Sequence, residues 1–351
     1  MEGYFHQVTK ETPTRFWVNN PTPDETDKAI AAGAISCTTN PTYSIKQIAS
    51  ETERDYALNV VDETVKETED DDEAADLVQQ KLVKRIMHKF QPLYERRPGE
   101  QGFVSVQGSP HGDDDSDNII DEALRYRRLG KNIIAKVPAT EAGLKAIEKL
   151  ITMNVPIIAT EIMAVSQAIF ACELYQRVSK VKGKHPPFYV THITGIFDDH
   201  MKNVVTRDNI AVSPDALQQA GCIVARKQYR ILKERRYPGV MLGGGARGLH
   251  HFTEMVGGDM HITINWKGTA DKLIQNNPPV VNRMDAEAPK HVVDELSEKV
   301  PDFRKAYSED GLTVEEFKKF GPVKLFRDSF VEGWDSLLKV VKERRENITF
   351  S

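Results

Sequence analysis

The stretch NIIAKVPATEAGLKAIEKLITMNVPIIAT, residues 132–160, indicates the plan of the fold. It opens with a β-branched run, Asn132 to Pro138, and continues with the helical pattern TEAGLKAIEKLITMN. It closes with a second run, Val155 to Thr160. Both runs are short and apolar, as buried strands are. A helix between two successive strands implies that the strands pair in parallel.

The same alternation extends in both directions along the chain. The other candidate strands are RFWVN (15–19), AISCTT (34–39), GFVSVQ (102–107), FYVTHIT (188–194), PGVMLGG (238–244) and DMHITIN (259–265). Eight strands separated by helices predict an α/β fold that closes into a (β/α)8 TIM barrel. An open doubly wound sheet is the competing arrangement. No GxGxxG follows the first strand, however, and the glycines at 243–245 come too late for that role.

The 351 residues are expected to form a single domain, 1–351, around this barrel. The barrel core covers about 14–266, with an acidic helical insertion after the second strand, within residues 43–91. A helical extension over about 267–351 follows the last strand. The insertion and the extension could also pair copies of the chain in a homo-oligomer.

The composition excludes several classes of function. A balance of 47 basic against 52 acidic residues excludes a globally basic nucleic-acid-binding surface. No run of about 18 apolar residues occurs, so no transmembrane helix is expected, and the N-terminus lacks the order of a secretory signal. Three cysteines without a CxxC pair favour a reducing cytoplasm. We therefore expect a cytoplasmic protein that binds a small molecule, not nucleic acid or a membrane.

The active site of a barrel lies at the carboxyl ends of its strands, so polar residues there are the first candidates. Lys136 is the most informative, because it interrupts the apolar strand IIA-K-VP. Burial disfavours the charged form of a lysine and lowers its pKa. Such an amine can form a Schiff base with a ketone or aldehyde. The alternatives are a lysine that reaches solvent at the strand end and a lysine paired to a carboxylate.

The remaining strand ends carry neutral polar groups. They are Asn19, Thr38, Thr39, Asn40, Gln107, Thr160, Thr191, His192 and Asn265. Singly, such residues often cap turns, but a ring of them around a buried lysine suggests a carbohydrate pocket. The run GGGARG before a helix could bind an anion through backbone N–H groups and Arg247, or be a flexible turn.

A metal site is not expected from the histidine pattern. The neighbours His250 and His251 should not share one helix face, and neither HxxxH nor HExxH occurs.

Two motifs resemble those of the transaldolase family, which includes fructose-6-phosphate aldolase. They are CTTNPT, Cys37 to Thr42, and IIAKVPATEAGLKAIEKL, Ile133 to Leu150, and the order of elements follows the family from about Thr14 to Met260. The resemblance implies a class I aldolase barrel that needs no cofactor, with Lys136 as the Schiff-base lysine.

The resemblance also implies roles for other residues. Thr39 and Asn40 follow strand 2, and Asn40 would contact the dihydroxyacetone portion of the substrate. Gln107 falls where the family has glutamate or glutamine, and it would position a catalytic water beside Thr160. Thr191 would line the pocket.

Three departures from the family pattern bear on activity. Asn19 stands where the family has an acid/base aspartate, and an amide cannot exchange a proton at neutral pH. Asp24 and Glu25 lie just beyond it. Ile196 stands where the family has a phosphate-binding arginine. Gly245 stands where the family has a serine, while Arg247 keeps the family's basic residue. Substrate contacts are therefore expected at Asn19, Gly245 and Arg247, and the substrate's tail is left open.

The leading hypothesis is a Schiff-base-forming transaldolase or aldolase that acts on a ketose or ketose phosphate. The alternative is a catalytically impaired relative that binds a sugar or sugar phosphate, because of Asn19. A lysine-dependent lyase of another keto acid is a second enzyme alternative, but no carboxylate clamp is evident near Lys136.

Overall fold

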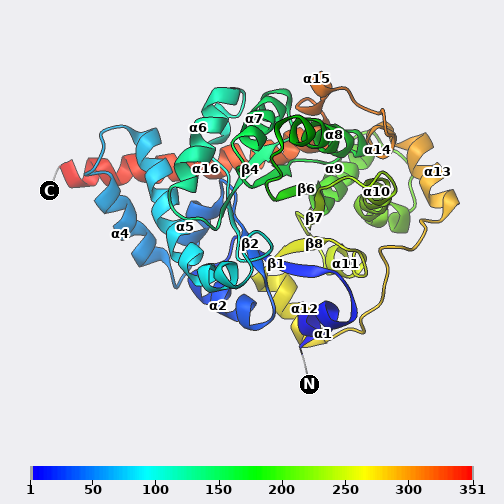
Figure 1. Ribbon diagram of the computed structural model, residues 1–351, viewed down its shortest axis with the longest axis horizontal. Coiled ribbons are helices and arrows are strands. Elements are labelled where there is room, and N and C mark those ends of the chain that lie inside the picture. Colours follow the sequence, from blue (N-terminus) through cyan, green and yellow to red (C-terminus); the bar gives the residue numbers. More distant parts are fainter. Residues whose placement is uncertain (1–2, 350–351) are drawn as a thin grey trace.

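The computed structural model describes residues 3–349 and shows a closed barrel of eight parallel strands, in which β1 pairs with β8 (Figure 1). This confirms the predicted barrel. The strands are β1 (Arg15–Asn19), β2 (Ser36–Thr38), β3 (Val104–Val106), β4 (Ile133–Pro138), β5 (Ile157–Thr160), β6 (Phe188–Ile193), β7 (Val240–Gly244) and β8 (His261–Asn265).

The strands β2 and β3 are shorter than the runs 34–39 and 102–107 predicted. Side chains add hydrogen bonds near their ends. Ser36 Oγ accepts from the Phe103 N–H, and Ser105 Oγ accepts from the Thr39 N–H. The serine contacts supplement backbone hydrogen bonds that still join the two runs, such as Gly102 N–H to the Ile35 carbonyl oxygen at 2.7 Å.

Helices connect the strands, as the alternation predicts. They are α2 (Pro23–Ala31), α6 (Ser116–Arg127) after the 3-10 turn η1 (Pro110–Gly112), α7 (Glu141–Thr152), α8 (Val165–Lys182), α9 (Thr194–Arg207), α10 (Pro214–Glu234) and α11 (His250–Thr253). The start of α7 explains part of the KVPATEAG motif. Thr140 Oγ1 accepts from the Gly143 N–H, and a Cβ at Gly143 would lie 1.8 Å from the Pro138 carbonyl oxygen. Only glycine fits this approach of helix to strand.

The expected insertion after strand 2 is present as α3 (Tyr43–Ala49), α4 (Arg54–Thr64) and α5 (Asp71–Arg96). The acidic run lies at the start of α5, where Asp70 accepts from the Glu73 N–H. Carboxylates are stabilised there by the helix dipole.

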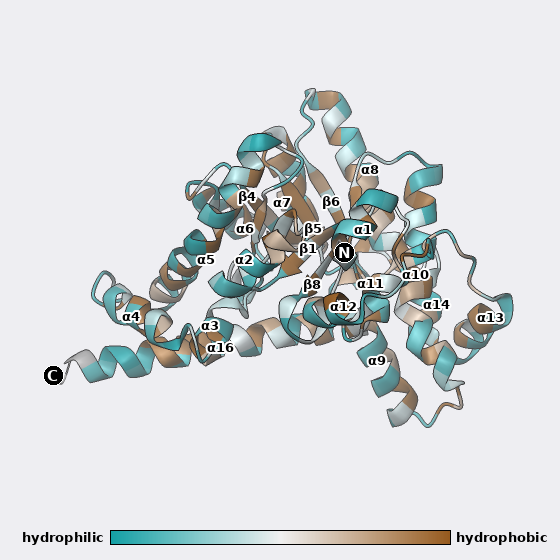
Figure 2. Cartoon of the chain, turned by 90° about the horizontal axis from the view of Figure 1, so that it is seen from below, coloured by the Kyte–Doolittle hydropathy of each residue, from teal (hydrophilic) through white to brown (hydrophobic). Residues whose placement is uncertain are grey.

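The expected C-terminal helices are also present. They are the irregular turn η2 (Trp266–Ala270), α12 (Asp271–Asn276), α13 (Lys290–Lys299), α14 (Pro301–Tyr307), α15 (Val314–Phe317) and α16 (Gly321–Thr349). The long α16, red in Figure 1, crosses the molecule and contacts α3, α4, α5, α9 and η1. In Figure 2 it runs along one side of the fold, from near α9 to beyond α4. Arg327 pairs with Asp113 at 2.9 Å and thereby ties α16 to the loop after β3.

A helix at the N-terminus, α1 (Tyr4–Glu11), was not expected from the sequence. It has only eight residues, which is too short for a clear periodic signal. Its Phe5 stacks on Phe16 of β1 at a centroid distance of 4.0 Å. The helix is therefore held by packing against the barrel rather than by its own propensity.

Six apolar side chains fill the lower part of the barrel interior. They are Trp17, Phe103, Ile134, Ile158, Tyr189 and Leu242, and all are buried. Successive side chains of a strand point to opposite faces, so the residue two positions further along also faces the interior. The apolar layer thus determines which residues face inward at the carboxyl ends.

No helix within residues 3–349 is both long and apolar enough to cross a membrane. Cys37, Cys172 and Cys222 are buried free thiols. Burial raises the pKa of each thiol above its usual value, which makes the thiolate scarce.

If α16 and the barrel form one domain, loosening α16 should destabilise the whole fold. Trp334 on α16 is fully buried, so Trp334→Ala should lower the free energy of unfolding by about 3–5 kcal/mol in a single transition. Urea unfolding followed by circular dichroism measures this change. Lys339→Ala is the control on the same helix, because that side chain is 77% exposed. A separate, earlier transition of α16 in the unaltered protein would contradict the single-domain prediction.

Candidate active site

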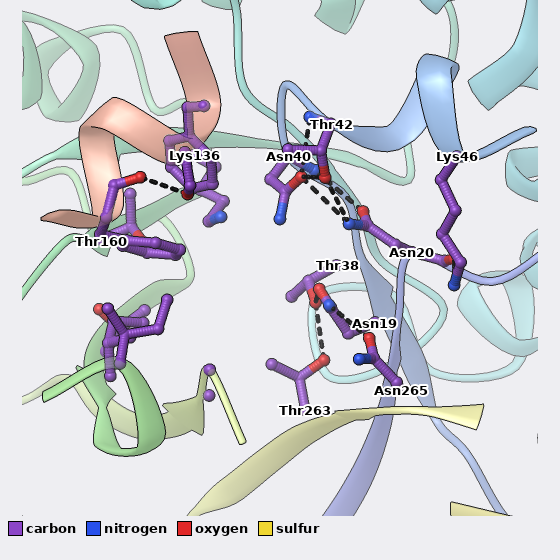
Figure 3. A pocket seen from close by; sticks show the side chains of 18 of the residues that line it. Asn19, Asn20, Thr38, Asn40, Thr42, Lys46, Lys136, Thr160, Thr263 and Asn265 are labelled. Atoms are coloured by element: carbon purple, nitrogen blue, oxygen red, sulfur yellow. Dashed lines mark hydrogen bonds between the residues drawn. The ribbon is translucent and has the colours of Figure 1, made fainter. Parts of the chain in front are cut away.

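A polar layer lies directly above the apolar layer of the barrel. It contains residues two positions beyond that layer, Asn19, Lys136, Thr160, Thr191 and Gly244, together with Thr38 of β2 and Thr263 of β8. These residues line a cavity of about 460 Å³ (Figure 3). Asn20, Asn40, Thr42 and Lys46 from the loops and α3 extend the polar lining, and Phe326, Ser329 and Phe330 of α16 complete it.

Lys136 is a buried amine without a partner. Its side chain comes from β4, opposite Ile158 of β5, and the residue is only 9% exposed. Among the described residues Nζ makes neither a hydrogen bond nor an ion pair, and it lies 5.4 Å from the centre of the Phe330 ring. Burial lowers the pKa of Lys136, and the nearby Glu161 carboxylate opposes this shift. The sequence left two alternatives to a nucleophile: a lysine that reaches solvent and a lysine paired to a carboxylate. The burial of Lys136 does not fit the first, and the lack of an ion pair does not fit the second.

Glu161 is a functional candidate that the sequence analysis missed. It follows the last residue of β5, is buried, and has a backbone φ of 62°, which is uncommon for a residue with a Cβ. Its Oε1 accepts from Gln107 Nε2 at 2.9 Å, and its Oε2 has no hydrogen-bond partner. Burial raises the pKa of Glu161, whereas the Gln107 hydrogen bond and the Lys136 charge lower it.

The signal for Glu161 was its position, one residue beyond a buried strand that ends in a predicted site residue. Strained backbone conformations of this kind concentrate at functional sites, because the surrounding structure must maintain them. Two further charges face the carboxylate, Asp113 and Arg327, which pair with each other.

Several buried polar atoms near Lys136 lack partners. They are Gln107 Oε1, Thr160 Oγ1, Thr191 Oγ1 and Glu161 Oε2. Thr160 and Thr191 line the main cavity, whereas Gln107 borders a small pocket on another side of Lys136. Buried polar groups are normally satisfied, so these atoms can bind water or a polar ligand.

The amides around Asn19 and Asn40 form an ordered network (Figure 3). Thr38 Oγ1 donates to Asn19 Oδ1, and Asn19 Nδ2 donates to Asn265 Oδ1, each at 2.9 Å. Asn40 Oδ1 accepts from Asn20 and from Thr42, which leaves Asn40 Nδ2 available to the cavity. The Asn19 side chain is thus held at the cavity edge but offers no ionisable group.

Neither acidic residue beyond Asn19 reaches the cavity. Asp24 pairs with Lys28 on the exposed face of α2, and Glu25 accepts from the Thr22 N–H at the start of that helix. They therefore do not replace an aspartate at position 19.

Thr39, predicted as a substrate contact, does not line this cavity. Thr39 is fully buried outside the cavity lining and donates through Oγ1 to the Ser105 carbonyl oxygen at 2.6 Å. The reason is the strand alternation, since the preceding Thr38 faces inward. His192 is likewise turned away beside the inward-facing Thr191, within hydrogen-bond distance of Gln228 and the Gly221 carbonyl oxygen.

The loop after β7 contributes Gly245 and Arg247 to the lining, and several of its donors already have partners. The N–H groups of Arg247 and Gly248 both donate to His251 Nδ1, at 2.9 and 3.2 Å. Arg247 Nε donates to Asp199 Oδ2 at 2.8 Å. Internal contacts therefore occupy part of the possible anion cradle in GGGARG.

His250 and His251 lie closer together than the sequence suggested. Their ring centroids are 3.9 Å apart, and one ligand atom from each lies within 4.8 Å of a carboxylate oxygen of Asp198. The pair begins a short helical turn, where ring rotation brings the side chains together. His251 Nε2 already lies 2.8 Å from Asp198 Oδ2, so a metal here would have to replace that contact.

A sequence model described as "Transaldolase/Fructose-6-phosphate aldolase" matches residues 16–320. The chain belongs to this family. The match runs from β1 through α15 and stops at the residue before α16. The family membership thus covers the whole barrel and every strand that contributes to the cavity.

Individual transaldolases align over shorter segments. The transaldolase of Neisseria meningitidis serogroup C (strain 053442) is 31% identical over 141 residues, which cover 36% of this chain and 39% of that protein. That of Trichodesmium erythraeum is 23% identical over 176 residues, or 44% of this chain and 46% of the other. That of Helicobacter pylori (strain Shi470) is 39% identical over 71 residues, or 20% and 22%. The chain spans less than half the length of each.

Within this transaldolase-family barrel, Glu161 and Lys136 should titrate together. Glu161→Gln removes a negative charge that raises the pKa of Lys136, so the pKa of the lysine should fall. More amine is then neutral at a given pH, and the pH dependence of its reaction with an aldehyde reagent should shift to lower pH. The pH profile of reductive labelling at Lys136, read by mass spectrometry, measures the shift.

Glu51→Gln serves as the control for Glu161→Gln, because Glu51 is exposed and lies outside the cavity. The same labelling profile for Glu161→Gln and the unaltered protein would contradict the electrostatic coupling.

Proposed function

We propose that the protein is a Schiff-base-forming aldolase of the transaldolase type, which transfers or releases a three-carbon ketol unit from a ketose. The observation that carries this proposal is the unpartnered, buried Nζ of Lys136 within a ring of neutral polar groups. Family membership supports an enzyme of the aldolase or transferase kind.

The chemistry requires only the lysine and proton carriers. Neutral Nζ adds to the ketone carbon, and loss of water gives an iminium ion. A base removes the proton of the hydroxyl on the β-carbon, and the adjacent C–C bond breaks. The electron pair of that bond moves into the iminium, so an aldehyde leaves and an enamine stays on Lys136. The enamine then attacks an acceptor aldehyde or takes up a proton, and water releases the product.

The surrounding groups supply positioning and proton transfer. Asn40 Nδ2 can donate to a hydroxyl of the three-carbon unit, and Asn19 holds the neighbouring wall through Asn265. The open acceptors of Gln107 and Thr160 can hold a water molecule near the amine. The carboxyl group of Glu161 lies near Lys136 and has a raised pKa. A raised pKa suits a group that carries protons near neutral pH.

Borohydride reduction tests the proposal directly. In the presence of dihydroxyacetone or a ketose, the reduced imine should add to Lys136 the mass of the sugar less one water plus two hydrogens, as located by peptide mass spectrometry. Lys136→Met should lose the adduct. Lys131→Met, which removes an exposed lysine of the loop before β4, should retain it. Unmodified Lys136 after treatment with a broad panel of sugars would refute a Schiff-base mechanism.

A second candidate, a sugar-binding protein without turnover, is favoured by one observation. Asn19 places an amide where a carboxylate would exchange protons, and no carboxylate of residues 3–349 lines the main cavity. Asn19→Asp tests it, since Asn265 can turn its amide to donate to the new carboxylate.

If the unaltered protein binds sugars without cleaving them and Asn19→Asp gains measurable retro-aldol activity, the binding function is supported. Turnover by the unaltered protein that is lost in Glu161→Gln would instead support the enzyme.

A further inference from the structure

Three cationic side chains line the cavity, and only one of them lacks a counter-charge. They are Lys46, Lys136 and Arg247. Lys136 is the proposed nucleophile, so it is consumed by imine formation. A charged substrate tail would therefore have to be bound by Lys46 or Arg247.

Arg247 is already neutralised. Its guanidinium is paired with Asp199 at 2.8 Å, and the stem of the side chain packs next to Gly195. Asp198, the residue before Asp199, places a second carboxylate next to this loop, because it lies 2.8 Å from His251 Nε2. A phosphate at this position would meet one arginine and two carboxyl groups.

Two backbone donors of the loop are also taken. The N–H groups of Arg247 and Gly248 point to His251 Nδ1, whose ring is buried and held on its other side by Asp198. Phosphate sites at strand-to-helix turns rely on such free N–H groups. To bind an anion here, the loop would have to abandon a buried hydrogen-bond network.

Lys46 lies on the opposite side and is no better placed for a phosphate. Its Nζ donates to the Asn20 carbonyl oxygen at 2.5 Å and lies 3.7 Å from Glu25 Oε2. Burial lowers the pKa of Lys46, which makes it a weaker cation.

The wall next to Gly245 is apolar. A Cβ at Gly245 would lie 2.5 Å from Ile193 and 3.5 Å from Ile196, so both isoleucines pack against this glycine. Leu242, Phe326 and Phe330 add to the apolar lining. A phosphate dianion placed against such a wall would lose its hydration without gaining charge-assisted hydrogen bonds.

We infer that the site selects sugars or aldehydes whose tail is unphosphorylated and uncharged. This inference rests on the proposed function and narrows its substrate class. Ring hydroxyls and short carbon chains match the amides on one side of the cavity and the isoleucines on the other. A phosphorylated tail matches neither.

Matched aldehyde acceptors test this selectivity. With dihydroxyacetone as donor, kcat/KM for D-glyceraldehyde should exceed that for D-glyceraldehyde 3-phosphate by about tenfold or more, because the phosphate finds no unpaired cation. The assay needs low ionic strength, since salt screens the interaction under test. A preference for the phosphorylated aldehyde would overturn the inference.

Asp199→Asn tests the physical reason for the selectivity. It frees the charge of Arg247 while keeping an oxygen that can accept its hydrogen bond, and Asp199 does not line the cavity. The kcat/KM for D-glyceraldehyde 3-phosphate relative to D-glyceraldehyde should rise about threefold or more. Asp208→Asn is the matched control, because Asp208 pairs with Arg207 at the far end of the same helix. An unchanged ratio in Asp199→Asn would overturn the charge-pairing argument.

A binding measurement separates this inference from the proposed function. Lys136→Met removes the chemistry, and calorimetry then compares D-fructose with D-fructose 6-phosphate. Tighter binding of the phosphate ester overturns the inference even if no sugar forms an imine. Weaker binding of the ester supports the inference. If dihydroxyacetone forms no adduct on the unaltered protein, that result refutes only the proposed function.

Discussion

The chemistry available to this barrel depends on the desolvation of one amine. Lys136 stands two residues above Ile134, in a barrel whose lower interior is filled by Trp17, Tyr189 and four other apolar side chains. Water therefore has no route to the amine from below, and Phe330 of α16 covers it from another side. Without this packing the lysine would remain an ordinary cation. The apolar core and the proposed nucleophile are consequently parts of one arrangement.

The distribution of carboxyl groups follows from the same burial. Around Lys136 the main cavity offers amides and hydroxyls, and the nearby carboxyl group of Glu161 comes directly after β5 rather than at the end of β1. Its hydrogen bond to Gln107 ties together two residues that lie 54 positions apart. This hydrogen bond holds an ionisable carboxyl group near Lys136, although position 19 carries an amide. A left-handed backbone at Glu161 is maintained because the barrel surrounds it.

The helix α16 belongs to the site although it lies beyond the part of the chain that matches the family model. It contributes Phe326, Ser329 and Phe330 to the cavity and is tied to the loop after β3 through Arg327 and Asp113. Its far end is fastened to the insertion, where Arg345 pairs with Asp71. The two segments added to the barrel thus hold each other, and together they determine how enclosed the cavity is.

The sequence by itself determined the barrel, the place of Lys136 and the family, because strand periodicity and the KVPATEAG motif are local signals. It also located Asn19, Asn40, Thr160 and Thr191 at the cavity. Contacts between distant segments decided the rest. Thr39 turns outward to Ser105, Glu161 turns toward Gln107, and Arg247 pairs with Asp199. Side-chain direction at a strand end and the pairing of charges depend on neighbours brought together by folding, so only the tertiary structure could determine them.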